Sequence, residues 1–459
     1  MRLRRLPQPR RTLLSAAVVT TLGLALFLAG GLGLAPWPSA HNPRSGEPAT
    51  GPPTGRDPMT AEITALQERL RRTPKDPVTL GTLGLNYVQQ VKTTGDPTYY
   101  PKAEEVLERS LALDTADNYT AMGGMAALEA ARHNFTRALD WSKRAIALNP
   151  YSSFLYGTLA DAYTQLGRYS DAADAVQKMV DLKPGTPSLA RASYAAELRG
   201  DTVTARTEMR RALKSASGPT DQAFARYYLS EIAFNNGDPA TALSEAEAGL
   251  RTAPSYTSLL QIKARAQAAL GKTDAAIADL TRAVQRLPLP EYVLQLGELY
   301  QSLGRHKEAV QQYEIFRAEQ KLFADNGVTP DSDAVLFEAD HGDRERALAI
   351  ARQGVENRPF LDSHDALAWA LHVNGRDEEA LAESDRALAL GTRNALFHYH
   401  RAMIQHALGN HSAARSGLTK ALAINPHFNP LQAPKARAAL NALRPAGAEG
   451  VEHEGESGA

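Results

Sequence analysis

The residue types of a nucleophilic triad stand in succession at Ser363, His364 and Asp365, within the stretch LDSHDAL. A triad needs serine, histidine and carboxylate side chains that form a chain of hydrogen bonds. Adjacent residues at the start of a helix point in different directions, so this succession does not predict a triad. Capping of a helix by Asp362 or Ser363 accounts for the stretch better.

Other patterns typical of enzymes are missing from the sequence. It has no Walker-type phosphate loop, no glycine-rich dinucleotide fingerprint after a strand and no His-Glu-x-x-His stretch. It also has no cysteine, which excludes thiolate nucleophiles, thiolate zinc sites and disulfides. We therefore expect a protein that is not an enzyme and that uses no cofactor.

Histidines are concentrated toward the C-terminus, where seven of the twelve lie between His364 and His427. Two pairs repeat at a distance of 34 residues, His364 with His398 and His372 with His406. Equivalent residues of stacked repeats lie near one another, so His372 and His406 could form a two-ligand metal or pH-sensing site. A duplicated repeat that kept its residues explains the pairs without metal. A metal carrier or sensor is therefore the alternative function, and no metal site is assigned.

Charge is balanced over the 459 residues, with 51 Lys and Arg against 51 Asp and Glu. A strongly basic chain would favour nucleic acid or an anionic membrane surface, and this chain is not basic. We expect no nucleic-acid partner. Any preference for a charged partner must come from a local concentration of side chains.

Eight glycines recur along the chain, each with an alanine five residues later. Two further alanines, Ala103 and Ala138, extend the series backwards, and His133 stands where a glycine would precede Ala138. Neighbouring alanines are 33 to 38 residues apart. The glycines are Gly167, Gly200, Gly237, Gly271, Gly304, Gly342, Gly375 and Gly409, and their alanines are Ala172, Ala205, Ala242, Ala276, Ala309, Ala347, Ala380 and Ala414.

A proline follows six of these alanines at a distance of twelve residues, at Pro150, Pro184, Pro254, Pro288, Pro359 and Pro426. The stretch LGELYQSLG, residues 296–304, adds a Leu-Gly pair and a tyrosine. A period near 34 that is filled by two amphipathic helical segments resembles the tetratricopeptide repeat family, over about residues 80–428. The resemblance implies an all-α, right-handed superhelical solenoid of about ten tetratricopeptide-like helix hairpins that acts as a non-catalytic scaffold for protein partners.

Elementary backbone chemistry predicts the same unit. Glycine enters the left-handed region at a helix end at little steric cost, and proline cannot easily continue a helix. A small alanine lets the two helices of a hairpin approach closely, whereas a bulky side chain would push them apart. Each hairpin leaves an apolar face that only the next hairpin can cover, so the hairpins stack.

The N-terminus suggests export. Five arginines, at positions 2, 4, 5, 10 and 11, precede an uncharged stretch of 24 residues from Thr12 to Ala35, long enough to cross a bilayer as a helix. The arginines place the N-terminus in the cytoplasm and the repeats outside it. We expect a single-pass anchor in the cell membrane, of the bacterial membrane-anchored or exported type. The alternative is a signal sequence, with secretion after its cleavage.

Composition and repeat register divide the chain into segments. The insertion RAEQKLFADNGVTPD indicates a longer second helix, a loop and a possible internal break in the repeat array. The predicted segments are a basic leader with the transmembrane anchor or signal sequence (1–35), a Pro/Gly-rich linker (36–58), an N-terminal capping helix (59–79), the repeat array (80–428) with its break at 317–331, a C-terminal capping helix (429–444) and a disordered acidic tail (445–459).

In proteins that resemble this family, ligands lie on the concave face lined by the first helix of each repeat. Residues thirteen, ten, six and three before each glycine fall on that face, where Arg265 is the only Lys or Arg among several carboxylates and aromatic rings. Such a face favours partners with basic segments. The alternative is that the rings are packing residues and the carboxylates a solvated face. The expected partner-binding residues are Asp161, Tyr194, Glu197, Phe224, Tyr227, Glu231, Arg265, Glu291, Glu298, Trp369 and Tyr399.

Overall fold

A computed structural model describes residues 58–443, and every regular element in that range is an α-helix. The first half contains α2 (Pro58–Arg72), α3 (Pro77–Thr94), α4 (Tyr99–Leu113), α5 (Tyr119–Ala131), α6 (Phe135–Leu148), α7 (Ser153–Gln165), α8 (Tyr169–Leu182), α9 (Thr186–Glu197), α10 (Thr202–Ser215), α11 (Pro219–Asn235) and α12 (Pro239–Thr252). The second half contains α13 (Thr257–Ala269), α14 (Thr273–Arg286), α15 (Pro290–Ser302), α16 (His306–Asp325), α17 (Ser332–His341), α18 (Arg344–Asn357), α19 (Leu361–Val373), α20 (Asp377–Ala387), α21 (Ala395–Ala407), α22 (His411–Ile424) and α23 (Gln432–Ala442).

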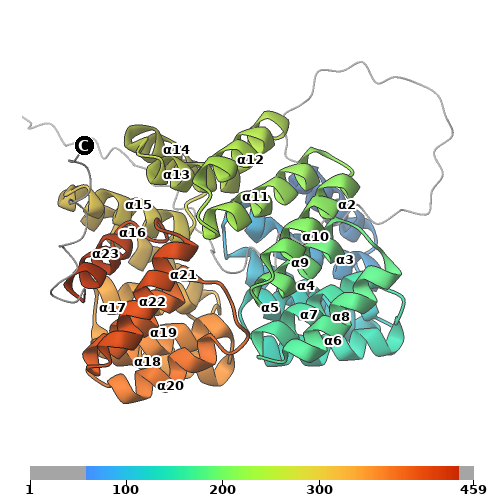
Figure 1. Ribbon diagram of the computed structural model, residues 1–459. Helices are drawn as coiled ribbons and strands as arrows, with labels where there is room; N and C mark the ends of the chain where they lie inside the picture. Colours follow the sequence, from blue (N-terminus) through green and yellow to red (C-terminus); the bar gives the residue numbers. More distant parts are fainter. Residues whose placement is uncertain (1–57, 444–459) are drawn as a thin grey trace, which may run out of the picture.

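These helices form consecutive hairpins, from α3/α4 to α21/α22, with α2 packed before the first and α23 after the last. Each hairpin packs on the next, which makes the molecule an all-α helical repeat solenoid. Figure 1 shows the array curving round, so that the orange and red helices lie beside the cyan and green ones, with α12 to α14 along the top. The predicted fold class is confirmed at this level.

The alanines of the repeat are buried where the two helices of a hairpin meet, and all ten have little or no exposed surface. In two hairpins the contact also includes a hydrogen bond that spans twelve residues. The Ser193 hydroxyl donates to the carbonyl of Ala205 at 2.7 Å, and the Ser230 hydroxyl donates to that of Ala242 at 2.6 Å. The small alanine therefore lets the two helices approach closely. In these two hairpins the close approach also brings the alanine carbonyl within hydrogen-bond distance of the serine on the facing helix.

Seven of the eight predicted turn glycines have a positive φ, from 68° at Gly167 to 78° at Gly237. Gly342 is the exception, with φ −135°, because Asp343 caps α18 and the connection from α17 stays extended. His133 has φ 65° and takes the left-handed conformation that glycine adopts in the other turns. Its ring makes a contact that a glycine could not, as described below.

Helix α16 is twenty residues long and matches the longer second helix predicted for the insertion. Its last turns reach the N-terminal hairpins, where Phe323 and Val328 join the buried cluster of α3 to α5. Glu319 lies on the same stretch of α16, only 2 % exposed, and its Oε2 has no hydrogen-bond partner. Burial alone raises the pKa of Glu319 to about 9.

Two stretches of the array lie against each other although they are far apart in sequence. We call α3–α12 the first coil, and we call α17–α23 together with the loop that precedes α17 the last coil; the contact between them is the seam. At one end of the seam His133 Nδ1 lies 2.9 Å from the Thr329 carbonyl oxygen, and the Thr329 backbone N–H donates to the Arg132 carbonyl at 3.2 Å. At the other end the Asn425 side-chain amide donates to the Phe234 carbonyl at 2.9 Å.

The seam has a regular register. The turn at Gly167 meets the loop before α19, and the turn at Gly200 meets the loop before α21, at the Gly391 carbonyl. A β-carbon at Gly167 would lie 2.6 Å from the Pro359 carbonyl oxygen, and one at Gly237 would lie 2.7 Å from that of Ile424. Successive turns of the first coil therefore meet successive loops of the last coil, and at these positions glycine is required by the close approach as well as by its φ.

None of the helices between residues 58 and 443 combines the length and the apolar character that a bilayer span needs. The predicted span, residues 12–35, lies outside the described residues. The predicted linker up to residue 57 and the predicted tail from residue 445 onward lie outside them too.

Candidate partner-binding face

Asp161, on α7, is bound to another residue of the chain. Arg191 on α9 donates from Nε to Oδ1 at 2.9 Å and from Nη2 to Oδ2 at 2.6 Å, and the side chains are only 2 % and 8 % exposed. Burial raises the pKa of Asp161, against the opposing effect of Arg191 and Lys92. Burial, with the charge of Arg191, also lowers the pKa of Lys92 to about 7. The Asp161 carboxylate therefore joins neighbouring repeats and is not free for a partner.

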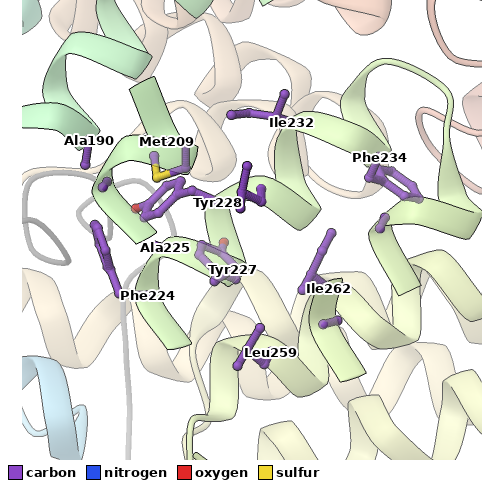
Figure 2. Packing of buried hydrophobic residues seen from close by; sticks show 14 of the residues in the cluster. Ala190, Met209, Phe224, Ala225, Tyr227, Tyr228, Ile232, Phe234, Leu259 and Ile262 are labelled. Carbon is purple, nitrogen blue, oxygen red and sulfur yellow. The ribbon is translucent and has the colours of Figure 1, made fainter. Parts of the chain in front are cut away.

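Phe224 and Tyr227 on α11 belong to the core. They are 4 % and 6 % exposed and meet Tyr228 at ring-centroid distances of 4.8 and 4.9 Å. Figure 2 shows these rings packed among Met209, Ile232 and other apolar side chains. We therefore leave both residues out of the proposed binding face.

Trp369 and Tyr399 are also buried, in the last coil. The indole N–H of Trp369 donates to Asp340 at 2.9 Å, and its ring stacks on His400 at 4.2 Å. Tyr399 lies 5.9 Å from the indole, between it and Phe428. These rings pack against residues of neighbouring repeats, so we leave them out of the proposed binding face as well. Tyr194 is only partly buried and packs across the seam against the start of α19.

Glu231 on α11 and Arg265 on α13 form a partly exposed ion pair. Arg265 Nη1 lies 2.8 and 2.9 Å from the two carboxylate oxygens, and the guanidinium stacks over Phe234 at 4.4 Å. Opposite charges six residues before successive glycines thus meet between neighbouring hairpins. The structure brings these two predicted residues together.

Glu197 and Glu291 are compensated by positive charge to a lesser extent than Glu231 is. Burial, then the charge of Glu231, raises the pKa of Glu197 to about 7, and a hydrogen bond to Asn235 opposes that shift. Burial and Glu231 likewise raise the pKa of Glu291 to about 7, against the effect of Arg265. The Glu291 Oε1 accepts from Gln295 at 3.0 Å, whereas its Oε2 has no hydrogen-bond partner.

Glu298 on α15 binds residues of the last coil. Its carboxylate accepts from the Asn429 side-chain amide at 2.9 Å and lies 3.5 Å from His341 Nε2. The predicted site residue therefore holds the loop before α23 in place. A substitution at Glu298 would disturb this contact together with any partner.

The last coil adds two carboxylates, Asp333 and Asp362, that are not among the predicted partner-binding residues. Burial raises the pKa of Asp362 to about 7, and Arg358 opposes this shift. Burial also raises the pKa of Asp333 well above its usual range, with further contributions from Asp331 and Glu291. Arg358 is buried beside them and donates to Ser363 at 3.3 Å. We call Glu197, Glu231, Glu291, Asp333 and Asp362 the inner carboxylates.

The position of Asp333 explains why the sequence did not reveal it. It lies nine residues before Gly342, outside the positions assigned to the inner face, and α17 has only ten residues. Asp362 was placed on that face by the sequence but was left out of the site. A search for acidic residues at helix starts near the insertion would have found Asp331 and Asp333.

The residues of LDSHDAL form no triad, as expected, but the capping prediction is wrong. His364 Nδ1 pairs with Glu383 at 2.7 Å, whereas Asp365 pairs with His400 at 2.8 Å. Helix α19 begins at Leu361 with Phe360 as its cap residue, so Asp362 and Ser363 already lie inside the first turn. The side chains point to different neighbours, as expected for adjacent helical residues.

Each histidine of the predicted pair has a contact of its own. His372 Nδ1 lies 2.5 Å from Asp377 Oδ1, on the next helix of its own hairpin, and His406 packs against His411 at 5.4 Å. In the part of the chain that the structure describes, no three or more His, Cys, Asp or Glu side chains are placed to hold a metal ion.

The arrangement is a helical repeat array, and family models support the same class. Two models described as tetratricopeptide repeat match residues 155–186 and 263–320. These matches cover α7/α8 and the array from α13 to α16, within the range of the resemblance seen in the sequence. They support the tetratricopeptide repeat family for this chain. Tetratricopeptide repeats generally mediate protein–protein interactions and are generally non-catalytic.

A search of curated proteins finds no match. Solved structures that are similar include a thermophilic TPR protein of Thermus thermophilus, with 21 % identity, TM-score 0.36 and coverage of 41 % of this chain and 98 % of that one. A tetratricopeptide repeat protein of Parabacteroides merdae has 18 % identity, TM-score 0.33 and coverage of 56 % and 98 %. Human IFIT1, solved as a dimer with m7Gppp-AAAA, has 13 % identity, TM-score 0.45 and coverage of 72 % and 77 %. We draw no functional conclusion from these likenesses.

Proposed function

We propose that the protein is a non-catalytic scaffold that binds protein or peptide partners with basic segments at the inner carboxylates. The observation that carries this proposal is that, among the described residues, no salt bridge holds Glu197 or Glu291 and that Glu291 Oε2 has no hydrogen-bond partner. In keeping with this, the pKa of Glu197, Glu291 and Asp362 is raised, each to about 7. Burial and neighbouring carboxylates make ionisation of these groups costly. A lysine or arginine side chain of a partner relieves that cost, because it supplies the opposite charge.

The test uses the full chain and pairs of synthetic peptides, one rich in Lys or Arg and its match with Gln at those positions. The variant is Glu197→Gln with Glu291→Gln, because neither carboxylate is held by an ion pair as Glu231 is. We expect slower association of the basic peptide and a flatter salt dependence. The control is Glu105→Gln with Glu108→Gln, two exposed residues of α4.

Three results would contradict the proposal. One is equal binding of the basic and the Gln-containing peptides. The second is that the control pair weakens binding as much as the inner pair does. The third concerns pH: each carboxyl group with a pKa near 7 that must ionise on binding should raise the affinity about tenfold between about pH 6 and pH 8, so a constant affinity over that range would also contradict the proposal.

We propose further that the repeats are tethered to the cell membrane and face away from the cytoplasm. The support is the arginine-flanked apolar stretch of residues 12–35. Protease added to spheroplasts of an expressing bacterium should digest the repeat region and spare a short N-terminal fragment. Full protection of the repeats in intact spheroplasts, with digestion after lysis, would overturn the topology.

A further inference from the structure

The seam brings carboxylates of the two coils together at its centre. Tyr194 on α9 packs in one apolar cluster with Phe360 and Leu361 at the start of α19. Glu197 follows Tyr194 on the same helix, and Asp362 follows Leu361, so each acid stands beside a seam contact. The charge of Asp362 contributes to the raised pKa of Glu197. The two acids therefore repel each other when both are ionised.

Other charged and titratable groups face this pair from the surrounding elements. Arg358, in the loop before α19, offsets part of the charge of Asp362, whereas Asp365 on α19 adds to it. The remaining groups that interact with one of the two acids are Glu231 and Asn235 of α11, Tyr194 of α9, Tyr169 of α8 and Asp333 of α17. Among the acidic and basic groups that surround the pair, the three carboxyl groups of Glu231, Asp333 and Asp365 outnumber the one guanidinium of Arg358.

We propose that the seam is a pH-responsive latch, which closes the first coil onto the last when Glu197 and Asp362 hold protons and loosens when both ionise. The contacts on either side of the pair are short hydrogen bonds and turn-to-loop contacts, which a local repulsion can weaken. The latch controls access to Tyr194, whose ring is partly covered by the loop before α19 in the closed form.

The pKa directions fit this assignment. Both acids have a pKa near 7 in the closed form, above their ordinary values of 4.5 for Glu197 and 3.8 for Asp362, so closure is favoured at low pH, weakens as the pH rises from about 5 to 7 and stays weak above that. His133, at one end of the seam, has its pKa lowered to about 4 by burial and by Arg358. His133 therefore stays neutral over the same range, and its contact with Thr329 does not respond.

The test measures the distance between the coils in the full chain. Because the chain has no cysteine, a spin-label pair at Lys178→Cys on α8 and Arg415→Cys on α22 reports on the two coils alone. Both residues are exposed and on opposite sides of the seam. A second pair, Lys178→Cys with Glu247→Cys on α12, stays within the first coil and is the control. Electron–electron double resonance gives the distance distribution at each pH.

We expect the distance between the coils to lengthen or broaden from about pH 5 to pH 8, with most of the change below about pH 7, while the distance within the first coil stays constant. Glu197→Gln with Asp362→Asn should keep the short distance at both pH values, and Glu197→Gln alone should reduce the response. High salt at the upper pH should restore part of the short distance, because it screens the repulsion.

The latch is refuted if the distance between the coils does not change with pH. It is also refuted if Glu197→Gln with Asp362→Asn, whose helicity is checked by circular dichroism, responds as the parent does. If this double variant loses helicity, the single variant Glu197→Gln decides, and an unchanged response in it refutes the latch. The experiment involves no partner, so its failure leaves the proposed function standing.

Discussion

Glu319 offers a sharp test of the energetics of the fold. Its pKa of about 9 exceeds the ordinary value of 4.5 because of burial alone. The folded protein therefore holds a proton that the unfolded chain releases, and its stability falls as the pH rises between these values. The cost is about 1.4 kcal/mol for each pH unit, which makes about 4 kcal/mol between about pH 5 and pH 8. Glu319→Gln removes the ionisable group and should remove this loss.

The assay is urea unfolding of the full chain, followed by circular dichroism at several pH values. The quantity to compare is the difference in unfolding free energy between Glu319→Gln and the parent, since other titrating groups cancel in it. We expect a difference near zero at pH 5 that grows in favour of the variant toward pH 8. Glu314→Gln, an exposed residue on the same helix, should show no such growth. A difference that is independent of pH, or a variant less stable at pH 8, would refute a buried neutral Glu319.

Two further substitutions test the packing by the same assay. Replacing Ala276 with Leu should overpack the α13/α14 contact and cost about 1 to 3 kcal/mol, whereas Ala65→Leu on the exposed face of α2 should cost little; equal effects would contradict the assigned register. Arg191→Met should cost about 3 to 5 kcal/mol, because it leaves the buried Asp161 charge unpaired, and Asp161→Leu in the same chain should recover much of that; no recovery would show that the arginine acts through other contacts.

The sequence predicted the hairpins because their determinants are local. Gly271 lies in the turn between α13 and α14, and Ala276 lies five residues later, where these two helices touch. Helix geometry sets this spacing in the sequence. The inner face was harder to predict. The first helix of a hairpin has neighbours on several sides, so a residue at an inner position can be either buried or accessible. Phe224 and Tyr399 are examples that turn out to be buried. Spacing alone does not distinguish these two cases.

The seam could not be predicted from spacing at all. Its contacts depend on how much each repeat rotates against the next, summed over several repeats, and a small error per repeat moves the last coil far from the first. Asn425 and Thr329 look like ordinary loop residues in the sequence. His133 could have indicated the seam in the sequence, because a bulky residue stands in a position that elsewhere holds glycine. A residue of this kind adopts the left-handed conformation only where a contact offsets the cost in free energy.

A repeat array is usually a one-dimensional system, in which each unit senses only its neighbours and the ends can fray independently. Here Phe234 and Asn425 are hydrogen-bonded across 191 residues, and His133 and Thr329 are in contact across 196. Such links raise the mean sequence separation of contacts, which slows folding. They also couple the stability of the first hairpins to that of the last ones. Loss of the C-terminal hairpins should therefore increase hydrogen exchange at the turns of α5/α6 and α11/α12, far away in the chain.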